Sequence, residues 1–164
     1  MTLMTLQEMG FIFRYMEGRD LAVVVDIAFR SRRADEYRWD RNDYLARLVR
    51  DDTQARVVVE IVSGEPRVVG AVVYRFLKTH IEVNRMILDP DLPDRKSLEF
   101  GFIDTMRVMA LKAKRGLEFN VLQAPSRPVK ADELPLWTDD FDWHHIADSP
   151  AFIFERPDRK QEDQ

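Results

Sequence analysis

The stretch that decides the fold is IEVNRMILDPDLPDRKSLEFGFIDTMRVMALKAKRG, residues 81–116. It predicts a strand over 81–88, a proline-containing loop over 89–96, and a long helix from about Ser97 to Arg115. Gly116 then fits the position that ends such a helix. A strand that enters a helix through a short loop directs the free amides of the first helical turn at one place, and this arrangement attracts anions. The stretch therefore predicts a place for a phosphate-bearing group.

The residues before this stretch indicate two more strands, over 55–62 and 67–77, joined by a turn that contains Gly64. With a third strand over 79–88, the middle of the chain becomes an antiparallel meander. Gly70 inside the second strand indicates a bulge or a close approach of neighbouring backbone.

The first forty residues after the N-terminal segment predict one strand and two helices. Residues 11–16 are short, apolar and aromatic, which is typical of a strand. Asp20 and Asp40 are placed to begin the two helices. The apolar positions expected on the buried helix faces are Leu21, Val24, Val25 and Ala28 in the first helix, and Tyr44, Leu45, Leu48 and Val49 in the second.

The pattern weakens after the long helix. Residues 117–122 predict a strand parallel to its predecessor, because a helix crosses between the two. A short helix fits within 131–137, and 151–154 is a last strand.

The length supports one domain. We expect an N-terminal extension over 1–10, a single domain over 11–156, and a flexible charged tail over 157–164. The formal charge of −4 argues against a nucleic-acid binder that works through a basic surface. The lack of cysteine excludes disulfides and thiolate sites. With no signal-peptide pattern and no long apolar run, the expected location is the cytoplasm.

Four local strings resemble one family. They are Phe13–Met16 with Asp20–Val24, Val68–Val72 around its glycine, Met86–Pro90, and the helix end Ala113–Gly116. Together with the element order they resemble the GNAT-type N-acetyltransferases. The resemblance implies an α/β fold with a mixed, mostly antiparallel twisted sheet flanked by helices, in the order β-α-α-β-β-β-α-β-α-β.

The resemblance also implies a site and a chemistry. In that family, acetyl-CoA lies where the fourth strand separates from the fifth, and a following loop wraps its pyrophosphate. Carried onto this sequence, the cofactor-binding positions are Met86, Ile87, Leu88, Asp94, Arg95, Lys96, Ser97 and Leu98. Glu82 matches the position of a general base on the fourth strand. Strand alternation equally allows Glu82 to face solvent.

The pyrophosphate loop departs from the family pattern Q/R-x-x-G-x-G/A. The register set by Pro90 places Pro93, Lys96 and Leu98 at the three diagnostic positions, and none of them matches. Asp94 would repel a phosphate and could cap the helix amides with its own carboxylate. The basic pair that follows Asp94 offsets this in part.

A second departure is near Trp137. The string Leu136–Phe141 is similar to the family's Y-x-x-x-G-F but has Trp in place of Tyr, and an indole N–H is no general acid near neutral pH. Two functions follow from the resemblance. One is an acetyl-CoA-dependent transferase acting by direct transfer on a small-molecule or peptide amine, without nucleic-acid or membrane partners and with a homodimer as the expected assembly. The other is a catalytically silent GNAT-like domain that serves as a regulatory or protein-interaction module.

Two charged clusters fall outside this scheme. One contains carboxylates and imidazoles that resemble metal ligands, namely Asp139, Asp140, Asp142, His144, His145 and Asp148. No metal is expected there because the spacing matches no ligand motif, so a solvated acidic loop that could attract a cationic substrate is favoured. The other is a basic connector with interleaved aromatics, Arg30, Arg32, Arg33, Arg38 and Arg41 with Tyr37 and Trp39. It could border a substrate cleft, but a surface loop paired with nearby acids is favoured.

Overall fold

The computed structural model describes residues 4–31, 40–120, 142–145 and 151–155. Its elements are β1 (Ile12–Tyr15), a 3-10 turn (Gly18–Asp20), α1 (Leu21–Ser31), α2 (Arg41–Leu48), β2 (Thr53–Val62), β3 (Glu65–Phe76), β4 (His80–Leu88), α3 (Arg95–Lys112), β5 (Gly116–Asn120), β6 (Asp142–His145) and β7 (Ala151–Glu155).

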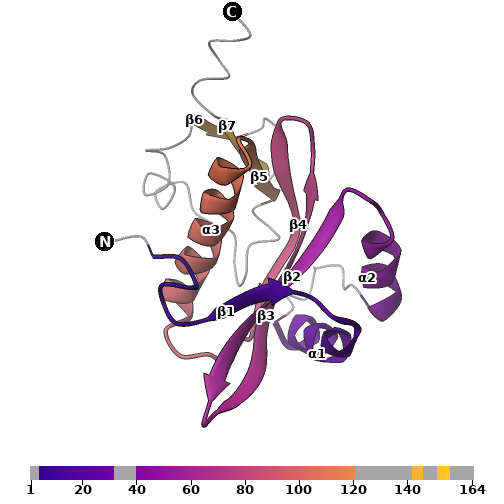
Figure 1. The fold of residues 1–164 in the computed structure, drawn as a ribbon, viewed down its shortest axis with the longest axis vertical. Helices are drawn as coiled ribbons and strands as arrows, with labels where there is room; N and C mark the ends of the chain where they lie inside the picture. The colour runs from indigo at the N-terminus through magenta and orange to yellow at the C-terminus, as the bar shows by residue number, and fades with distance from the viewer. Residues whose placement is uncertain (1–3, 32–39, 121–141, 146–150, 156–164) are drawn as a thin grey trace, which may run out of the picture.

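The strands form one sheet in the order β1-β2-β3-β4-β5-β7-β6. Only β4 and β5 are parallel, and the other neighbours are antiparallel. Helix α3 covers one face of the sheet, and α1 and α2 lie on the opposite face (Figure 1). The predicted mixed, mostly antiparallel α/β architecture is therefore confirmed.

The C-terminal part of the chain is described only in part, and one of its strands was not predicted. The short helix expected within 131–137 lies outside the described residues. The strand β6 was not predicted, because Asp142–His145 was interpreted as part of an acidic loop, and that interpretation was wrong for these four residues. The sequence DWHH lacks an alternating apolar pattern, so only its pairing with β7 makes it a strand.

The core consists of two layers, one on each face of the sheet. On the α3 face, strand residues such as Val72, Met86 and Leu88 pack with helix residues such as Phe102 and Met106. On the other face, strand residues pack against α1 and α2; the buried members there are Leu21, Val24, Ile27, Tyr44, Ala55, Val57, Val59, Ala71, Val73 and Ile87.

Helix α2 begins as predicted but turns a narrower face to the core. Asp40 accepts a hydrogen bond from the Asp43 amide, and the Asp43 side chain accepts one from the Asp40 amide, so the two form a capping box. Tyr44 is fully buried. Leu45 and Val49 were expected on the same face, but they are 42% and 80% exposed. The helix ends at Leu48, so Val49 lies beyond it, and the face that meets the core is formed by Tyr44 and Leu48.

Helix α3 begins two residues earlier than predicted and ends differently. Gly116 is the first residue of β5 and donates its amide to the Thr79 carbonyl. Lys114, with a φ of 55°, takes the left-handed position after the helix instead. Arg115 fixes this exit, because its Nε donates to the Leu77 carbonyl at 2.9 Å.

The N-terminal segment packs onto α3. Leu6 is fully buried in the α3 layer, and its amide donates to the Thr105 hydroxyl at 2.9 Å. Gly101 makes this contact possible, since a Cβ at that position would lie 2.5 Å from the Met9 sulfur and 3.3 Å from the Met4 carbonyl oxygen. The helix surface and the segment are therefore fitted to one another.

Gly70 lies at the predicted close approach. The β2–β3 register shifts beside it, with Val69 as the extra residue of the bulge. A Cβ on Gly70 would lie 2.8 Å from the Ile87 carbonyl oxygen and 2.8 Å from a methyl group of Leu88. The end of β4 thus occupies the space that a side chain at position 70 of β3 would need.

We expect Gly70→Ala to lower the free energy of unfolding by about 1–3 kcal/mol, the usual cost of forcing a methyl group into a packed interior. Urea unfolding followed by circular dichroism measures the change. Gly18→Ala is the matched control, because nothing lies within 4 Å of a Cβ there. Equal effects of the two substitutions would contradict the close approach at Gly70.

Candidate functional site

The candidate site begins where β4 and β5 stop pairing. The parallel register runs from His80–Gly116 to Val83–Phe119 and includes no later residue of β4. Asn84 follows at once and is the extra residue of a bulge against β3, since Arg85 pairs with Val73 while Val83 pairs with Tyr74. A bulge bends the strand that carries it. The bulge therefore lies where the described pairing of the two strands ends.

Beyond the bulge, residues 85–88 are bonded to β3 along one edge. Their other edge has no β5 partner within the described residues. The side chains of Met86 and Leu88 point into the α3 layer, and Ile87 points into the opposite layer. The side chains of these three predicted cofactor-binding residues are thus buried in the two core layers. Their backbone groups on the edge without a described β5 partner are the part that could bind a cofactor.

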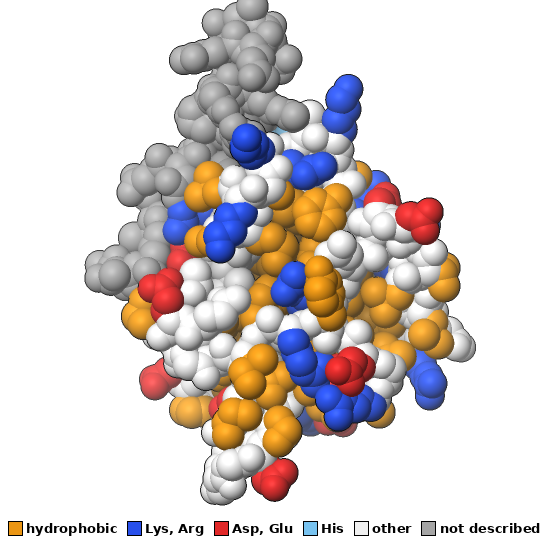
Figure 2. Space-filling view, viewed as in Figure 1, with side chains coloured by type: hydrophobic (Ala, Val, Ile, Leu, Met, Phe, Trp, Pro, Cys, Tyr) orange, Lys and Arg blue, Asp and Glu red, His pale blue; other side chains and the backbone are white. Residues whose placement is uncertain are grey.

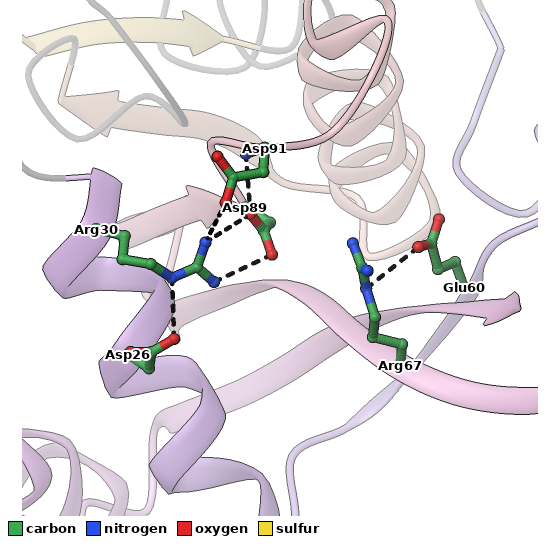
Figure 3. Close-up of polar contacts among 6 residues, drawn as sticks. All are labelled: Asp26, Arg30, Glu60, Arg67, Asp89 and Asp91. Carbon is green, nitrogen blue, oxygen red and sulfur yellow. Dashed lines mark hydrogen bonds and ion pairs between the residues drawn. The ribbon is translucent and has the colours of Figure 1, made fainter.

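The loop between β4 and α3 is tied to α1 by one arginine (Figure 3). The Nη1 and Nη2 atoms of Arg30 donate to the two carboxylate oxygens of Asp89 at 3.0 and 3.1 Å. Its Nη1 also reaches Asp91 at 2.8 Å, and its Nε reaches Asp26 at 2.9 Å. The Asp89 carboxylate additionally accepts the Asp91 amide at 2.9 Å. Two of the loop's acidic side chains thus share one arginine from another element.

This network shifts the pKa values of Asp89 and Arg30. The hydrogen bonds from Arg30 hold the pKa of Asp89 below its ordinary value of 3.8, against the opposing effect of burial. The bond to Asp89, followed by the bond to Asp26, raises the pKa of Arg30. Both shifts favour the charged forms of Asp89 and Arg30.

The start of α3 keeps its first amides uncapped by a side chain. Asp94 is the N-cap residue, in a left-handed conformation with φ 52° and ψ 36°, and its carboxylate makes no capping hydrogen bond. The expectation that Asp94 caps the helix through its side chain was therefore wrong, because a capping side chain normally belongs to a residue with extended backbone and Asp94 is left-handed. The amides of residues 95–97 have no partner within an α-helix.

Leu98 lies deeper than the rest of the predicted loop set. Its side chain is 4% exposed in the α3 layer, and its amide already donates to the Asp94 carbonyl at 3.2 Å. Ser97 is exposed in the first turn. The positions able to present free amides are thus Arg95, Lys96 and Ser97.

Glu82 lies two residues before the bulge, on the face of β4 opposite α3, since its neighbours Ile81 and Val83 point into the α3 layer. Its side chain is partly exposed, and its Oε1 lies 3.8 Å from Arg75 Nε. Asp52 approaches the same nitrogen at 3.6 Å. The predicted base, Glu82, therefore lies beside the end of the described β4–β5 pairing and forms an ion pair with Arg75.

The two charged clusters are only partly placed. Arg32, Arg33, Tyr37, Arg38, Trp39, Trp137, Asp139, Asp140 and Asp148 lie outside the described residues. Arg41 begins α2, and Asp142, His144 and His145 belong to β6. Among the residues the structure describes, no three histidine, cysteine, aspartate or glutamate side chains gather closely enough to hold a metal ion.

Sequence reasoning missed two features of this site. Arg30 was assigned to a surface connector, but it holds Asp89, 59 positions away. The bulge at Asn84 was also missed, because residues 81–88 were interpreted as one regular strand. The one local signal was the change of phase, since Ile81 and Val83 share a face with Met86 and Leu88.

No protein-family model matches the sequence, and a search of curated proteins finds no match. Solved structures do match. The PaiA N-acetyltransferase from Thermoplasma acidophilum in complex with coenzyme A is 15% identical with a TM-score of 0.58, over 90% of this chain and 98% of that chain. The ribosomal-protein-S18-alanine N-acetyltransferase from Escherichia coli is 14% identical with a TM-score of 0.58, over 88% and 91%.

A third neighbour, Ard1 from Thermoplasma volcanium, is 17% identical with a TM-score of 0.57, over 89% of this chain and 96% of that chain. Other matches carry the GNAT family name, including a probable acetyltransferase from Chromobacterium violaceum. At these identities the likeness establishes the fold: this chain has the fold of the GNAT N-acetyltransferases. The predicted resemblance is confirmed at that level. No helix in the described part of the chain has the length and apolar character needed to cross a bilayer.

We expect Arg30→Gln to lower the free energy of unfolding at pH 7 by about 1–2 kcal/mol, the range of a charged hydrogen bond reduced because the arginine is partly exposed. Asp89 stabilises the fold above its unfolded pKa of 3.8, and this stabilisation is lost as the pH falls through its lower folded pKa. The difference between variant and wild type should therefore shrink below about pH 4. Thermal unfolding at pH 7 and pH 3 measures it.

Arg67→Gln is the control for this substitution. Arg67 pairs with Glu60 at 3.3 Å, and its side chain is 53% exposed (Figure 3). The loss there should stay under about 1 kcal/mol. A loss for Arg30→Gln that does not change with pH would show that Asp89 is not the partner that matters.

Proposed function

We propose that this protein is an acyl-CoA-dependent N-acetyltransferase that acts on an amine by direct transfer. The observation that carries the proposal is the end of the described β4–β5 pairing after Val83, together with the uncapped start of α3, in a chain with the GNAT fold. An unpaired strand edge can bond an amide-containing chain, and free helix amides can bond phosphates. These two groups are the parts of coenzyme A that need holding.

The residues present fit acetyl-CoA through their backbone more than through their side chains. The unpaired edge of Met86–Leu88 would hold the pantetheine arm, and the amides of residues 95–97 would hold the pyrophosphate. Pro93 contributes no amide, and the Asp94 carboxylate opposes an anion. Arg30 reduces the remaining negative charge of the loop by pairing with Asp89 and Asp91.

Acetyl-CoA, when bound, supplies an acetyl group activated as a thioester. The contribution of the chain is to hold the reactants and to accept a proton. In this proposal the carboxylate of Glu82 takes the proton that the amine loses as its nitrogen bonds the acetyl carbon. Arg75, 3.8 Å away, holds this carboxylate on the face of β4 away from α3. The leaving thiolate is stable enough to depart without a tyrosine.

The acceptor is a small-molecule or peptide amine. Two structural neighbours bear names of different acceptors, the alanine of a ribosomal protein and spermidine, so the fold serves both kinds. We also propose a cytoplasmic location and a homodimeric assembly, which fractionation and sedimentation test. One neighbour is described as a dodecamer, so assembly varies among proteins with this fold.

Titration with desulfo-CoA tests cofactor binding without turnover. Calorimetry should show saturable binding, and at one hundred times the Kd the ligand should stabilise the protein by about 2.7 kcal/mol, visible as a rise in Tm. Asp94→Asn should tighten binding about two- to fivefold, because a charge near a helix start contributes up to about 1 kcal/mol. Asp51→Asn, in an exposed turn, is the matched control and should leave the Kd unchanged. The lack of any heat or Tm change at millimolar ligand would contradict the proposal and favour the catalytically silent domain.

Glu82→Gln tests the base. We expect turnover of an accepted amine to fall by about 10²-fold or more while the Kd for desulfo-CoA is kept, since a general base contributes about 10²–10⁴-fold. The control is Glu60→Gln, another partly buried strand glutamate in an arginine pair, which should leave turnover unchanged. Unchanged turnover in Glu82→Gln would remove Glu82 from the mechanism.

A further inference from the structure

A groove lies beside the C-terminal half of α3, away from the residues of the candidate cofactor site. Figure 2 shows hydrophobic side chains gathered in a depression between α3 and the strands, with lysine and arginine side chains around them. The cavity has a volume of about 710 Å³ and is lined by Thr5, Gln7, Glu8, Phe13, Arg56, Thr105, Val108, Met109, Lys112 and Ala113. This volume is within the range of small-molecule sites in proteins.

The floor of the groove holds a half-buried arginine in a fixed position. Arg56 Nε donates to the Tyr74 hydroxyl at 3.0 Å, and that hydroxyl donates to Gln54 Oε1 at 2.9 Å. The guanidinium carbon of Arg56 also lies over the rings of Tyr15 and Phe13, 4.1 and 5.4 Å from their centroids. These contacts use Nε and the faces of the guanidinium, which leaves the Nη edge for another partner.

No carboxylate of the described residues pairs with Arg56, in contrast to several other arginines. Arg14 is paired with Asp20, Arg30 with Asp89, and Arg107 with Asp104. An arginine held among aromatic rings with its paired donors unoccupied is suited to bidentate recognition of a carboxylate. The local pattern thus indicates an anion partner.

The other charged residues that line the groove also favour an anionic ligand. Lys112 is exposed on the rim of the groove. The single acidic group there, Glu8, accepts hydrogen bonds from the amide and hydroxyl of Thr5, which hold its pKa below the ordinary value. Glu8 is therefore already engaged in the N-terminal turn, and the lining carries one net positive charge.

The walls define the rest of the ligand. Phe13 from β1, Val108 and Met109 from α3, and Ala113 just after α3 form an apolar channel beside the guanidinium. We propose that this groove binds a monocarboxylate with an apolar chain, its carboxylate on Arg56 and its chain along α3. The site is separate from the start of α3 and does not depend on the proposed transferase activity.

Decanoate is the probe, titrated into the full chain by calorimetry with decanol as the uncharged comparison. Decanoate should bind saturably at one site, and decanol should bind at least tenfold more weakly. Arg56→Gln should weaken decanoate binding about tenfold or more, the usual contribution of a charge-assisted hydrogen bond. Arg67→Gln, which alters an exposed arginine outside the groove, should leave the Kd unchanged.

Val108→Trp fills the groove and leaves its charged residues unchanged. It tests the proposal independently if Arg56→Gln does not fold. It should abolish decanoate binding and keep the Kd for desulfo-CoA. Displacement of decanoate by desulfo-CoA would place the probe between β4 and β5 and overturn the proposal. So would the lack of saturation, or a wild-type dimer that Val108→Trp dissociates in sedimentation, since the groove would then be covered by a second copy.

Discussion

Strand β4 is bonded to β3 from Ile81 to Leu88, with a bulge at Asn84. Within the described residues its pairing with β5 covers four residues, His80 to Val83, and ends beside that bulge. The bulge shifts the phase of the β4 side chains, so that Met86 and Leu88 remain in the same apolar layer as Ile81 and Val83. Helix α3 packs on this layer through Phe102 and Met106. A regular strand without the extra residue would turn Met86 and Leu88 to the opposite face.

The loop that leaves β4 is then held by charge. Arg30 reaches from the end of α1 to both carboxylate oxygens of Asp89, and Gly70 allows the end of β4 to rest on β3. Glycines in a loop admit a phosphate by giving the backbone freedom to approach it. This chain lacks such glycines and instead has a loop fixed at both ends with a left-handed Asp94 before the helix. Such a loop is preorganised but electrostatically less favourable to an anion.

Local sequence patterns predicted the parts of the fold that depend on near neighbours. The meander, the capping of α2 by Asp40 and the close approach at Gly70 all follow from turn residues and alternation. The strand β6 was missed because its residues have no apolar pattern, and its conformation comes from pairing with β7. The Arg30–Asp89 pair and the Arg56 groove were missed for a related reason. Both join residues far apart in the chain, and a single sequence does not show which charges meet. The exposure of Leu45 and Val49 shows the opposite error, in which periodicity extended a buried face beyond the length of its helix.

In the proposed function, the bulged end of β4 and the uncapped start of α3 form one cofactor site. The most direct test is a titration of the ¹⁵N-labelled protein with desulfo-CoA, followed through its backbone amide resonances. We predict that the largest shifts fall together on residues 84–88 and 95–97 and saturate with one Kd. Shifts confined to other elements, or no shifts at millimolar ligand, would contradict the account.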